Sequence, residues 1–250
     1  MNPPEWDQKI FSLAQTVQLI NRKQADKVAV IIEPRNLSVL RDVLMWMTYL
    51  LAPAGWTFIA YVGTTSSRDI KAFVRRHRLQ DVIQIRHLDT DNLTFPQYNA
   101  LLTSPSFWES MPFENILIFQ TDSVLLANKL EPYLEYDYVG APWPKETGWL
   151  PKPVNTTGNG GLSLRRKSAM LRVLANVPYN DRNEDVFFSI DSSKYLNICP
   201  APKAVKFSVE TMFYKTPCGY HKPWRYMTEQ QMKTIYDHMD SVINRNGFPE

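Results

Sequence analysis

Four short clusters of polar residues interrupt this sequence, and their residue types are those that bind charged ligands or move protons. They lie at residues 120–122 (Q-T-D), 158–161 (G-N-G-G), 183–185 (N-E-D) and 221–222 (H-K). Asp122 is a lone acid within the apolar run 116–126, so it must be paired, hydrogen-bonded or metal-bound. The alternative is a strand-end aspartate that caps a neighbouring loop.

The second and third clusters combine backbone freedom with paired acids. Three glycines in four residues let the backbone approach a ligand closely, with Asn159 adding a side-chain contact, although an ordinary turn gives the same pattern. Glu184 and Asp185 begin an apolar stretch, where a helix N-terminus favours carboxylates. Capping accounts for two adjacent acids less well than for one, because successive side chains point in different directions.

The last cluster places an imidazole beside an ammonium group. His221 and Lys222 stand in C-G-Y-H-K-P-W, close to Trp224. The alternative to metal or phosphate binding is a core or surface histidine whose ring nitrogens are hydrogen-bonded within the protein or to water. Together the two side chains would form a clamp for a diphosphate.

The elements that must position these clusters alternate along the chain. Apolar runs predict strands at 28–33, 56–63, 82–88 and 116–126, and helical spacing predicts helices at 6–22, from Asn36 or Ser38 to Leu51, at 67–77 and at 96–102. This alternation implies a mixed, mostly parallel α/β sheet with helices on both faces, whose ligands bind beyond the carboxyl ends of the strands. Glu33, Arg35 and Asp122 would then share one rim.

The second half of the sequence begins with a segment rich in proline and glycine. Prolines between 142 and 153 and the glycine cluster predict active-site loops, followed by a strand at 162–165. A capping box at 228–231 predicts a last helix over about 228–246. Because the sequence has no internal repeat or linker, we expect a single domain over 1–250.

Composition excludes several classes of protein. The 250 residues are 44% hydrophobic with a formal net charge of +3, which suffices for a sizeable core and is too little for a nucleic-acid-binding face. Cys199 and Cys218 lack a zinc-site spacing and are predicted to be reduced thiols. No signal peptide or membrane-spanning run is visible, which predicts a cytoplasmic protein. No G-x-G-x-x-G follows the first strand, which argues against a dinucleotide or methyl-donor enzyme.

The order of the four clusters resembles that of the GT-A glycosyltransferases, which have a D-x-D strand end, a glycine-rich loop, an x-E-D motif and a late histidine. The stretches V-I-I-E-P-R, Y-V-G-A-P-W, G-N-G-G-L-S-L-R and G-Y-H-K-P-W more narrowly resemble a family of uncharacterised glycosyltransferase-like domains found in microbes and large viruses, over about 28–224. The resemblance implies a GT-A-like (Rossmann-like) fold, with a nucleotide-binding half at about 28–126 and an acceptor and catalytic half at about 127–226.

The resemblance also implies a donor and metal site. Asp122 matches the last acid of D-x-D and would bind a divalent metal, Mn²⁺ or Mg²⁺, with His221 completing the metal ligands or contacting phosphate. Gln120 replaces the first acid, and a neutral amide adds no negative charge for the metal. The implied donor-binding residues are Glu33, Arg35, Gln120, Asn159, Gly160, Gly161 and Lys222.

The implied reaction is inverting transfer of a hexosyl or deoxyhexosyl group from a UDP-, GDP- or dTDP-sugar to a glycan, lipid-linked or protein acceptor. Asp185 would take the proton of the acceptor hydroxyl, and Glu184 would bind donor or acceptor hydroxyls. Trp143 and Trp224 are candidates for stacking on sugars, with ordinary packing as the alternative. One rival is a nucleotide-sugar-binding module that has lost catalysis, and a structural protein would leave the ordered motifs unexplained.

Overall fold

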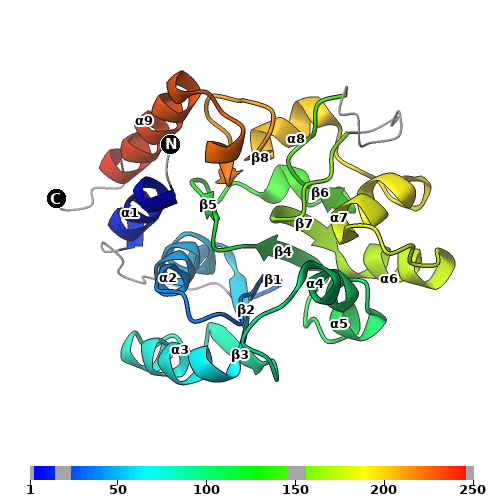
Figure 1. Ribbon diagram of the computed structural model, residues 1–250, viewed down its shortest axis with the longest axis horizontal. Helices are drawn as coiled ribbons and strands as arrows, with labels where there is room; N and C mark the ends of the chain where they lie inside the picture. Colours follow the sequence, from blue (N-terminus) through cyan, green and yellow to red (C-terminus); the bar gives the residue numbers. More distant parts are fainter. Residues whose placement is uncertain (1–2, 15–23, 146–155, 246–250) are drawn as a thin grey trace.

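The computed structural model describes residues 3–14, 24–145 and 156–245, which form layers around a central sheet (Figure 1). In these residues the central sheet has six strands in the order β3-β2-β1-β4-β7-β6, and a small sheet has three in the order β5-β9-β8. The strands are β1 (Lys27–Ile32), β2 (Trp56–Val62), β3 (Ile83–His87), β4 (Asn115–Phe119), β5 (Ser123–Leu125), β6 (Tyr138–Val139), β7 (Leu162–Arg166), β8 (Ser208–Val209) and β9 (Gly219–His221).

Helices cover both faces of the central sheet. The helices of the described residues are α1 (Pro3–Ala14), α2 (Val39–Leu51), α3 (Thr64–Arg76), α4 (Phe95–Leu102), α5 (Pro105–Glu109), α6 (Lys167–Asn176), α7 (Glu184–Val186), α8 (Ala201–Phe207) and α9 (Glu229–Arg245). Short helical turns are η1 (Ala52–Ala54), η2 (Glu131–Tyr133), η3 (Phe187–Asp191), η4 (Ser193–Tyr195) and η5 (Pro223–Arg225). In Figure 1, α1 and α9 lie side by side at the edge of the molecule, and they contact each other.

The pairing of the strands confirms the predicted fold class. β1 runs parallel to both β2 and β4, and β2 runs parallel to β3. β7 runs antiparallel to β4 and to β6, so the sheet is mixed but mostly parallel. All six residues of β1 are buried, as expected for a strand covered on both faces.

Most predicted elements appear close to their expected bounds. The predicted helix at 67–77 begins earlier, at Thr64, because Gly63 forms its N-cap and donates its N–H to Ser66 Oγ at 3.1 Å. The capping box of α9 is present, with Thr228 N donating to Gln231 Oε1 at 2.9 Å. The sequence did not predict α5, α6 or α8. For the helix expected over 6–22, residues 15–22 lie outside the described residues, as do Pro151 and Pro153 of the expected loops.

One predicted strand is wrong in a way that matters for the site. The apolar run 116–126 forms two strands in different sheets, β4 and β5, separated by residues 120–122. The break comes from Ser123, whose hydroxyl accepts from Gln120 N at 2.8 Å and donates to Gln120 O at 2.6 Å. Asp122 therefore lies in a turn at the carboxyl end of β4 and not within a strand.

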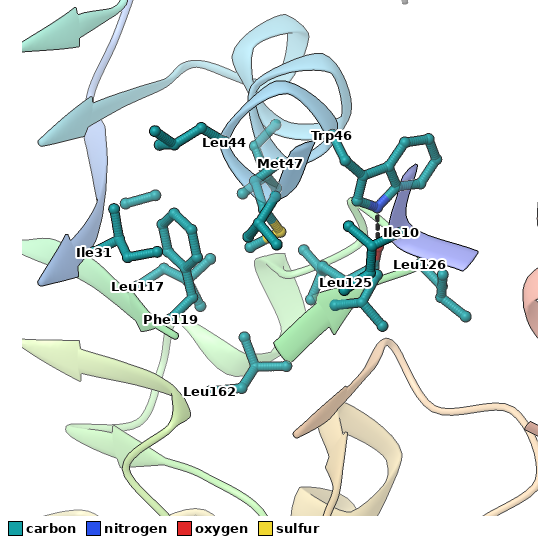
Figure 2. Packing of buried hydrophobic residues seen from close by; sticks show 14 of the residues in the cluster. Ile10, Ile31, Leu44, Trp46, Met47, Leu117, Phe119, Leu125, Leu126 and Leu162 are labelled. Atoms are coloured by element: carbon teal, nitrogen blue, oxygen red, sulfur yellow. Dashed lines mark hydrogen bonds between the residues drawn. The ribbon is translucent and has the colours of Figure 1, made fainter. Parts of the chain in front are cut away.

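The core consists of one large apolar cluster on each face of the central sheet. Alternate residues of β1 point to opposite faces, so Ile31 belongs to one cluster and Val30 to the other. Figure 2 shows the first cluster, in which Phe119 and Ile31 of the sheet lie below Met47 of α2. Trp46 extends this contact to the small sheet by donating its indole N–H to Leu125 O at 2.6 Å. The core thus fixes α2, β4 and β5 relative to one another.

The lengths and residue types of the described helices show whether any of them could cross a membrane. Within residues 3–14, 24–145 and 156–245, the structure has no helix with both the length and the apolar character needed to cross a membrane.

Truncating Phe119 tests the importance of this core. Its fully buried ring meets Phe58 edge to face at 6.2 Å, so Phe119→Ala should lower the free energy of unfolding by about 3–5 kcal/mol. Urea denaturation measures the change. Phe95→Ala is the matched control, because Phe95 is highly exposed and its truncation should change stability by no more than about 0.5 kcal/mol. Equal losses for both variants would contradict the assignment of the core.

Candidate functional site

The candidate site lies at the rim where the carboxyl ends of β1 and β4 meet. The chain leaves β1 for β2 and β3 on one side and returns to β4 on the other, so the strand order reverses between β1 and β4. In open α/β sheets, ligands bind in the crevice at this reversal. Glu33 directly follows β1 and Gln120 directly follows β4, which places both at the crevice.

β7 brings the glycine cluster to the same rim. Because β7 runs antiparallel to β4, its first residue, Leu162, pairs with Phe119 at the carboxyl end of β4. Ser123 Oγ lies 3.2 Å from Gly161 O, a contact that ties the cluster to the turn after β4. Gly161, at the end of the glycine cluster, therefore lies beside the turn that follows β4.

The small sheet brings His221 to Asp122. The pairing of β5 with β9 sets Ser123 opposite His221, and Lys222 N donates to Asp122 O at 2.8 Å. A Cβ atom at Gly161 would lie 2.1 Å from His221 Cε1 and 2.2 Å from His221 Nε2, so only glycine leaves room for the imidazole ring. The structure thus gathers Asp122, Gly161, His221 and Lys222 in one place.

The polar atoms of Gln120, Asp122 and His221 converge. His221 Nε2 lies 3.2 Å from Gln120 Oε1 and 3.3 Å from Asp122 Oδ1. Burial alone would lower the pKa of His221, but the carboxylates of Asp122 and Glu210 outweigh burial and raise it. Burial alone would raise the pKa of Asp122, but His221 and Lys222 outweigh burial and lower it. Asp122 is therefore held as a carboxylate.

Asp122 and His221 fit part of a metal site. Asp122 Oδ1 is buried and has no well-aligned hydrogen-bond partner among the described residues. Carboxylate and imidazole groups are ligands that divalent metals accept, and ions such as Mg²⁺ combine one or two carboxylates with substrate phosphates. Within the described ranges, no three His, Cys, Asp or Glu side chains form a group that could hold a metal. A bound diphosphate would supply further ligands.

Glu210 is a site residue that sequence reasoning missed. It follows β8, is only 3% exposed and accepts from Asn159 Nδ2 at 2.7 Å. Its Oε1 lies 3.3 Å from both His221 Nδ1 and Lys222 Nζ. Asn159 Oδ1 in turn accepts from Gly161 N at 3.0 Å. Glu210 therefore links the glycine cluster to the His-Lys pair, although no motif around it marks such a role.

The structure separates the two acids of N-E-D, and the predicted contact of Glu184 with donor or acceptor hydroxyls stays a prediction. Glu184 is buried and pairs through both oxygens with the fully buried Arg165, one of the two contacts being 3.0 Å from Arg165 Nη2. Its backbone N–H donates to Asn99 Oδ1 at 3.2 Å. Both carboxylate oxygens of Glu184 are thus occupied inside the protein. Its partner Arg165 stands in L-S-L-R-R, where nothing in the residue pattern predicts this pairing.

Asp185 faces a cavity instead. Its Oδ2 accepts from Gly160 N at 3.1 Å and its Oδ1 from Val186 N at 2.8 Å. Burial, assisted by the neighbouring Glu184, raises the pKa of Asp185 to about 7, although Arg165 and the two N–H groups oppose the rise. A carboxyl group that titrates near neutrality can both accept and release a proton there.

Two cavities among the described residues meet at this cluster. The first, of about 660 Å³, has a lining that includes Glu33, Arg35, Phe95, Tyr98, Asp122 and Lys222. The second, of about 510 Å³, has a lining that includes Trp143, Asn159, Asp185, Glu210, Lys222 and Tyr226. Lys222 borders both cavities, so a ligand in the first and a ligand in the second would meet beside it.

The remaining predicted residues divide between the site and the core. Arg35 donates from Nε to Glu33 Oε1 at 2.8 Å and from Nη2 to Glu33 Oε2 at 2.7 Å, so the two form an ion pair while lining the first cavity. Trp143 lines the second cavity. Trp224 fits the packing alternative, because its ring lies 5.2 Å from that of Trp6 and is partly buried against the apolar core.

The raised pKa of Asp185 predicts a pH-dependent cost in stability. The carboxyl ionises near pH 3.8 in the unfolded chain and near 7 in the folded protein, so folding is disfavoured progressively as pH rises through this window. Asp185→Asn stays neutral throughout. Its melting temperature relative to the wild type should therefore increase from pH 5 to pH 8, by about 2–4 °C for each kcal/mol.

Calorimetry at both pH values measures this difference. Loss of a backbone hydrogen bond in Asp185→Asn would lower the melting temperature equally at pH 5 and pH 8. The readout is therefore how the melting-temperature difference between variant and wild type changes from pH 5 to pH 8. Asp89→Asn, at an exposed position, serves as the control and should show the same difference at pH 5 and pH 8. A flat difference for Asp185→Asn as well would contradict the raised pKa.

Comparison with solved structures shows a shared fold at very low identity. A mannosyltransferase, PcManGT from Pyrobaculum calidifontis, in complex with GDP-Man and Mn²⁺, matches with a TM-score of 0.50 and 8% identity, over 79% of this chain and 61% of that chain. TarS 1-349 from S. aureus in complex with UDP has a TM-score of 0.48 and 9% identity, over 87% of this chain and 65% of that chain. The chain therefore spans less than two thirds of the length of these structures.

Sequence comparisons place the chain in a family. A search of curated proteins found no match. A family model described as "Protein of unknown function (DUF5672)" matches residues 82–221, which include β4, the glycine cluster, N-E-D and His221. Since the match covers more than half of the sequence, the chain belongs to the DUF5672 family.

Proposed function

We propose that this protein transfers a sugar from a nucleoside-diphosphate donor to an acceptor hydroxyl. The observation that carries the proposal is the junction of the two cavities, where Asp122, His221 and Lys222 gather on one side and Asp185 faces the other. A transferase needs a site for a leaving anion next to a site for a nucleophile, and this junction would provide both. The fold shared with a mannosyltransferase supports the same reading.

The donor would occupy the first cavity with its diphosphate at the charged end. Asp122, Lys222 and Arg225 line that end, while Glu33 and Arg35 stand after β1, where the base or ribose would lie. The sugar would then point toward Asn159 and the glycine cluster at the junction. Gly161 contributes indirectly, because its missing side chain leaves room for the His221 imidazole.

Departure of the diphosphate builds up negative charge that the site must stabilise. Lys222 and Arg225 contribute positive charge along the first cavity. A divalent metal held by Asp122 and His221 would supply further charge stabilisation as a Lewis acid. Gln120 holds the imidazole through its contact with His221 Nε2 and offers a neutral amide oxygen to the same space.

Asp185 would remove the proton of the acceptor hydroxyl in the second cavity. A general base works best when its pKa lies near the working pH, and the pKa of Asp185 is raised to about 7. The base and the leaving group would lie on opposite sides of the sugar, because Asp185 borders the second cavity and Asp122 borders the first. Attack from that side inverts the anomeric centre.

The first experiment asks which donor binds. Thermal unfolding with UDP-, GDP- and dTDP-sugars, each with and without Mn²⁺, should give one selective rise in melting temperature. A ligand at 100 times its dissociation constant stabilises by about 2.7 kcal/mol. Asp122→Ala should lose the part of the rise that depends on Mn²⁺. If no nucleotide changes the melting temperature of the wild type, the transferase proposal fails.

A second experiment separates chemistry from binding. Asp185→Asn should lower kcat by about 10²–10⁴-fold while the donor affinity stays close to that of the wild type. The wild-type rate should rise with pH through about 7, since only the ionised carboxylate accepts a proton. Analysis of the anomeric configuration of the product checks inversion, and a retained configuration would contradict the role of Asp185.

A donor-binding module without turnover is the second candidate. The neutral Gln120 favours this candidate. With glutamine at position 120, residues 120–122 contain one carboxylate, that of Asp122, to bind a metal. Binding of one nucleotide sugar without any product, across glycan, lipid-linked and protein acceptors, would support the module and exclude the enzyme.

A further inference from the structure

Phe95 is a feature of the first cavity that packing does not explain. Its side chain is 85% exposed, although it belongs to the cavity lining. The other exposed large hydrophobic residues of the described ranges are between 37% and 50% exposed. Because the ring of Phe95 is mostly exposed, it contributes little hydrophobic stabilisation to the fold. Its face is free to contact a ligand at the mouth of the cavity.

The surrounding chain holds Phe95 in a fixed place. Phe95 is the first residue of α4, directly after the N-cap residue Thr94. Thr94 N donates to Gln97 Oε1 at 2.9 Å and Gln97 N donates to Thr94 Oγ1 at 3.4 Å, which closes a capping box. Pro96 restricts the backbone at the next residue. The ring is therefore presented from an ordered helix end, which lowers the entropy cost of binding.

α4 spans the cavity from its mouth to its polar end. Phe95 and Tyr98 are three residues apart on the helix, so they share one face, and both line the cavity. Tyr98 OH accepts from Gln120 Nε2 at 3.3 Å, close to the turn that carries Asp122. The cavity thus has an aromatic end and a charged end. A nucleotide has the same polarity, with a flat base at one end and phosphates at the other.

We propose that Phe95 is the platform on which the base of the nucleotide stacks. The inference rests on the proposed function, because it takes the first cavity to be the nucleotide site. Stacking tolerates any base, since every base has a π face. The choice between bases would then fall to polar groups that line the same cavity, such as Asn92 and the Glu33–Arg35 pair.

Calorimetric titration with UDP, GDP and inorganic pyrophosphate, in the presence of Mn²⁺, tests the platform. Phe95→Ala should weaken the better-bound nucleoside diphosphate by about 5- to 150-fold, the range expected for loss of one base-aromatic stack. Pyrophosphate has no base, so its affinity should change by less than about twofold. Phe95→Trp keeps an aromatic face and should restore nucleotide binding. Phe11→Ala, at an exposed position of α1 outside both cavities, should leave all affinities unchanged.

The outcomes separate the platform from the proposed function. If the wild type binds UDP or GDP and Phe95→Ala binds it equally well, the platform is wrong while the nucleotide site stands. If Phe95→Ala weakens nucleotide and pyrophosphate alike, the ring does not act through the base, which also overturns the platform. If the wild type binds no nucleoside diphosphate, both proposals fail. An unchanged melting temperature of ligand-free Phe95→Ala confirms that the variant is folded.

Discussion

The hydroxyl group of Ser123 holds together the three segments from which the site is built. It accepts from Gln120 N, donates to Gln120 O and lies 3.2 Å from Gly161 O. These contacts end β4, turn the chain through Asp122 and direct β5 into the small sheet, where β9 sets His221 opposite Ser123. Without this turn, the run 116–126 would continue along the central sheet, and His221 would have no strand to pair with beside Asp122.

The sequence could predict the central sheet because its strands are local runs with a clear apolar pattern. Residues 28–33 are buried on both faces, and such a strand shows itself in the residue types alone. The break after Phe119 could not be predicted in this way, because the apolar pattern continues through Val124, Leu125 and Leu126. The Ser123 hydroxyl forms the turn, and the pairing of β5 with β9, about a hundred residues apart in sequence, holds the chain in its new direction.

The site shows the same division between local and distant information. The order of the clusters predicted that Asp122, Gly161 and His221 meet, and they do. The residue pattern does not indicate which of the two adjacent acids faces a cavity. That depends on the buried Arg165, which donates hydrogen bonds to both carboxylate oxygens of Glu184. Glu210 stands in no recognisable motif, and its role follows from its contacts with Asn159, His221 and Lys222, which come from separate segments.

Lys222 and Asp185, which border the meeting point of the two cavities, each carry a cost to the stability of the fold. Lys222 has the left-handed backbone angles φ 33° and ψ 48°, a conformation that costs a residue with a side chain about 1–3 kcal/mol. Its backbone N–H is fixed by Asp122 O and its ammonium lies at Glu210, so both ends of the residue are held. Ionised Asp185, across the junction, likewise works against the folded state. Both unfavourable features border the meeting point of the two cavities, where the proposed transfer would use Lys222 and Asp185.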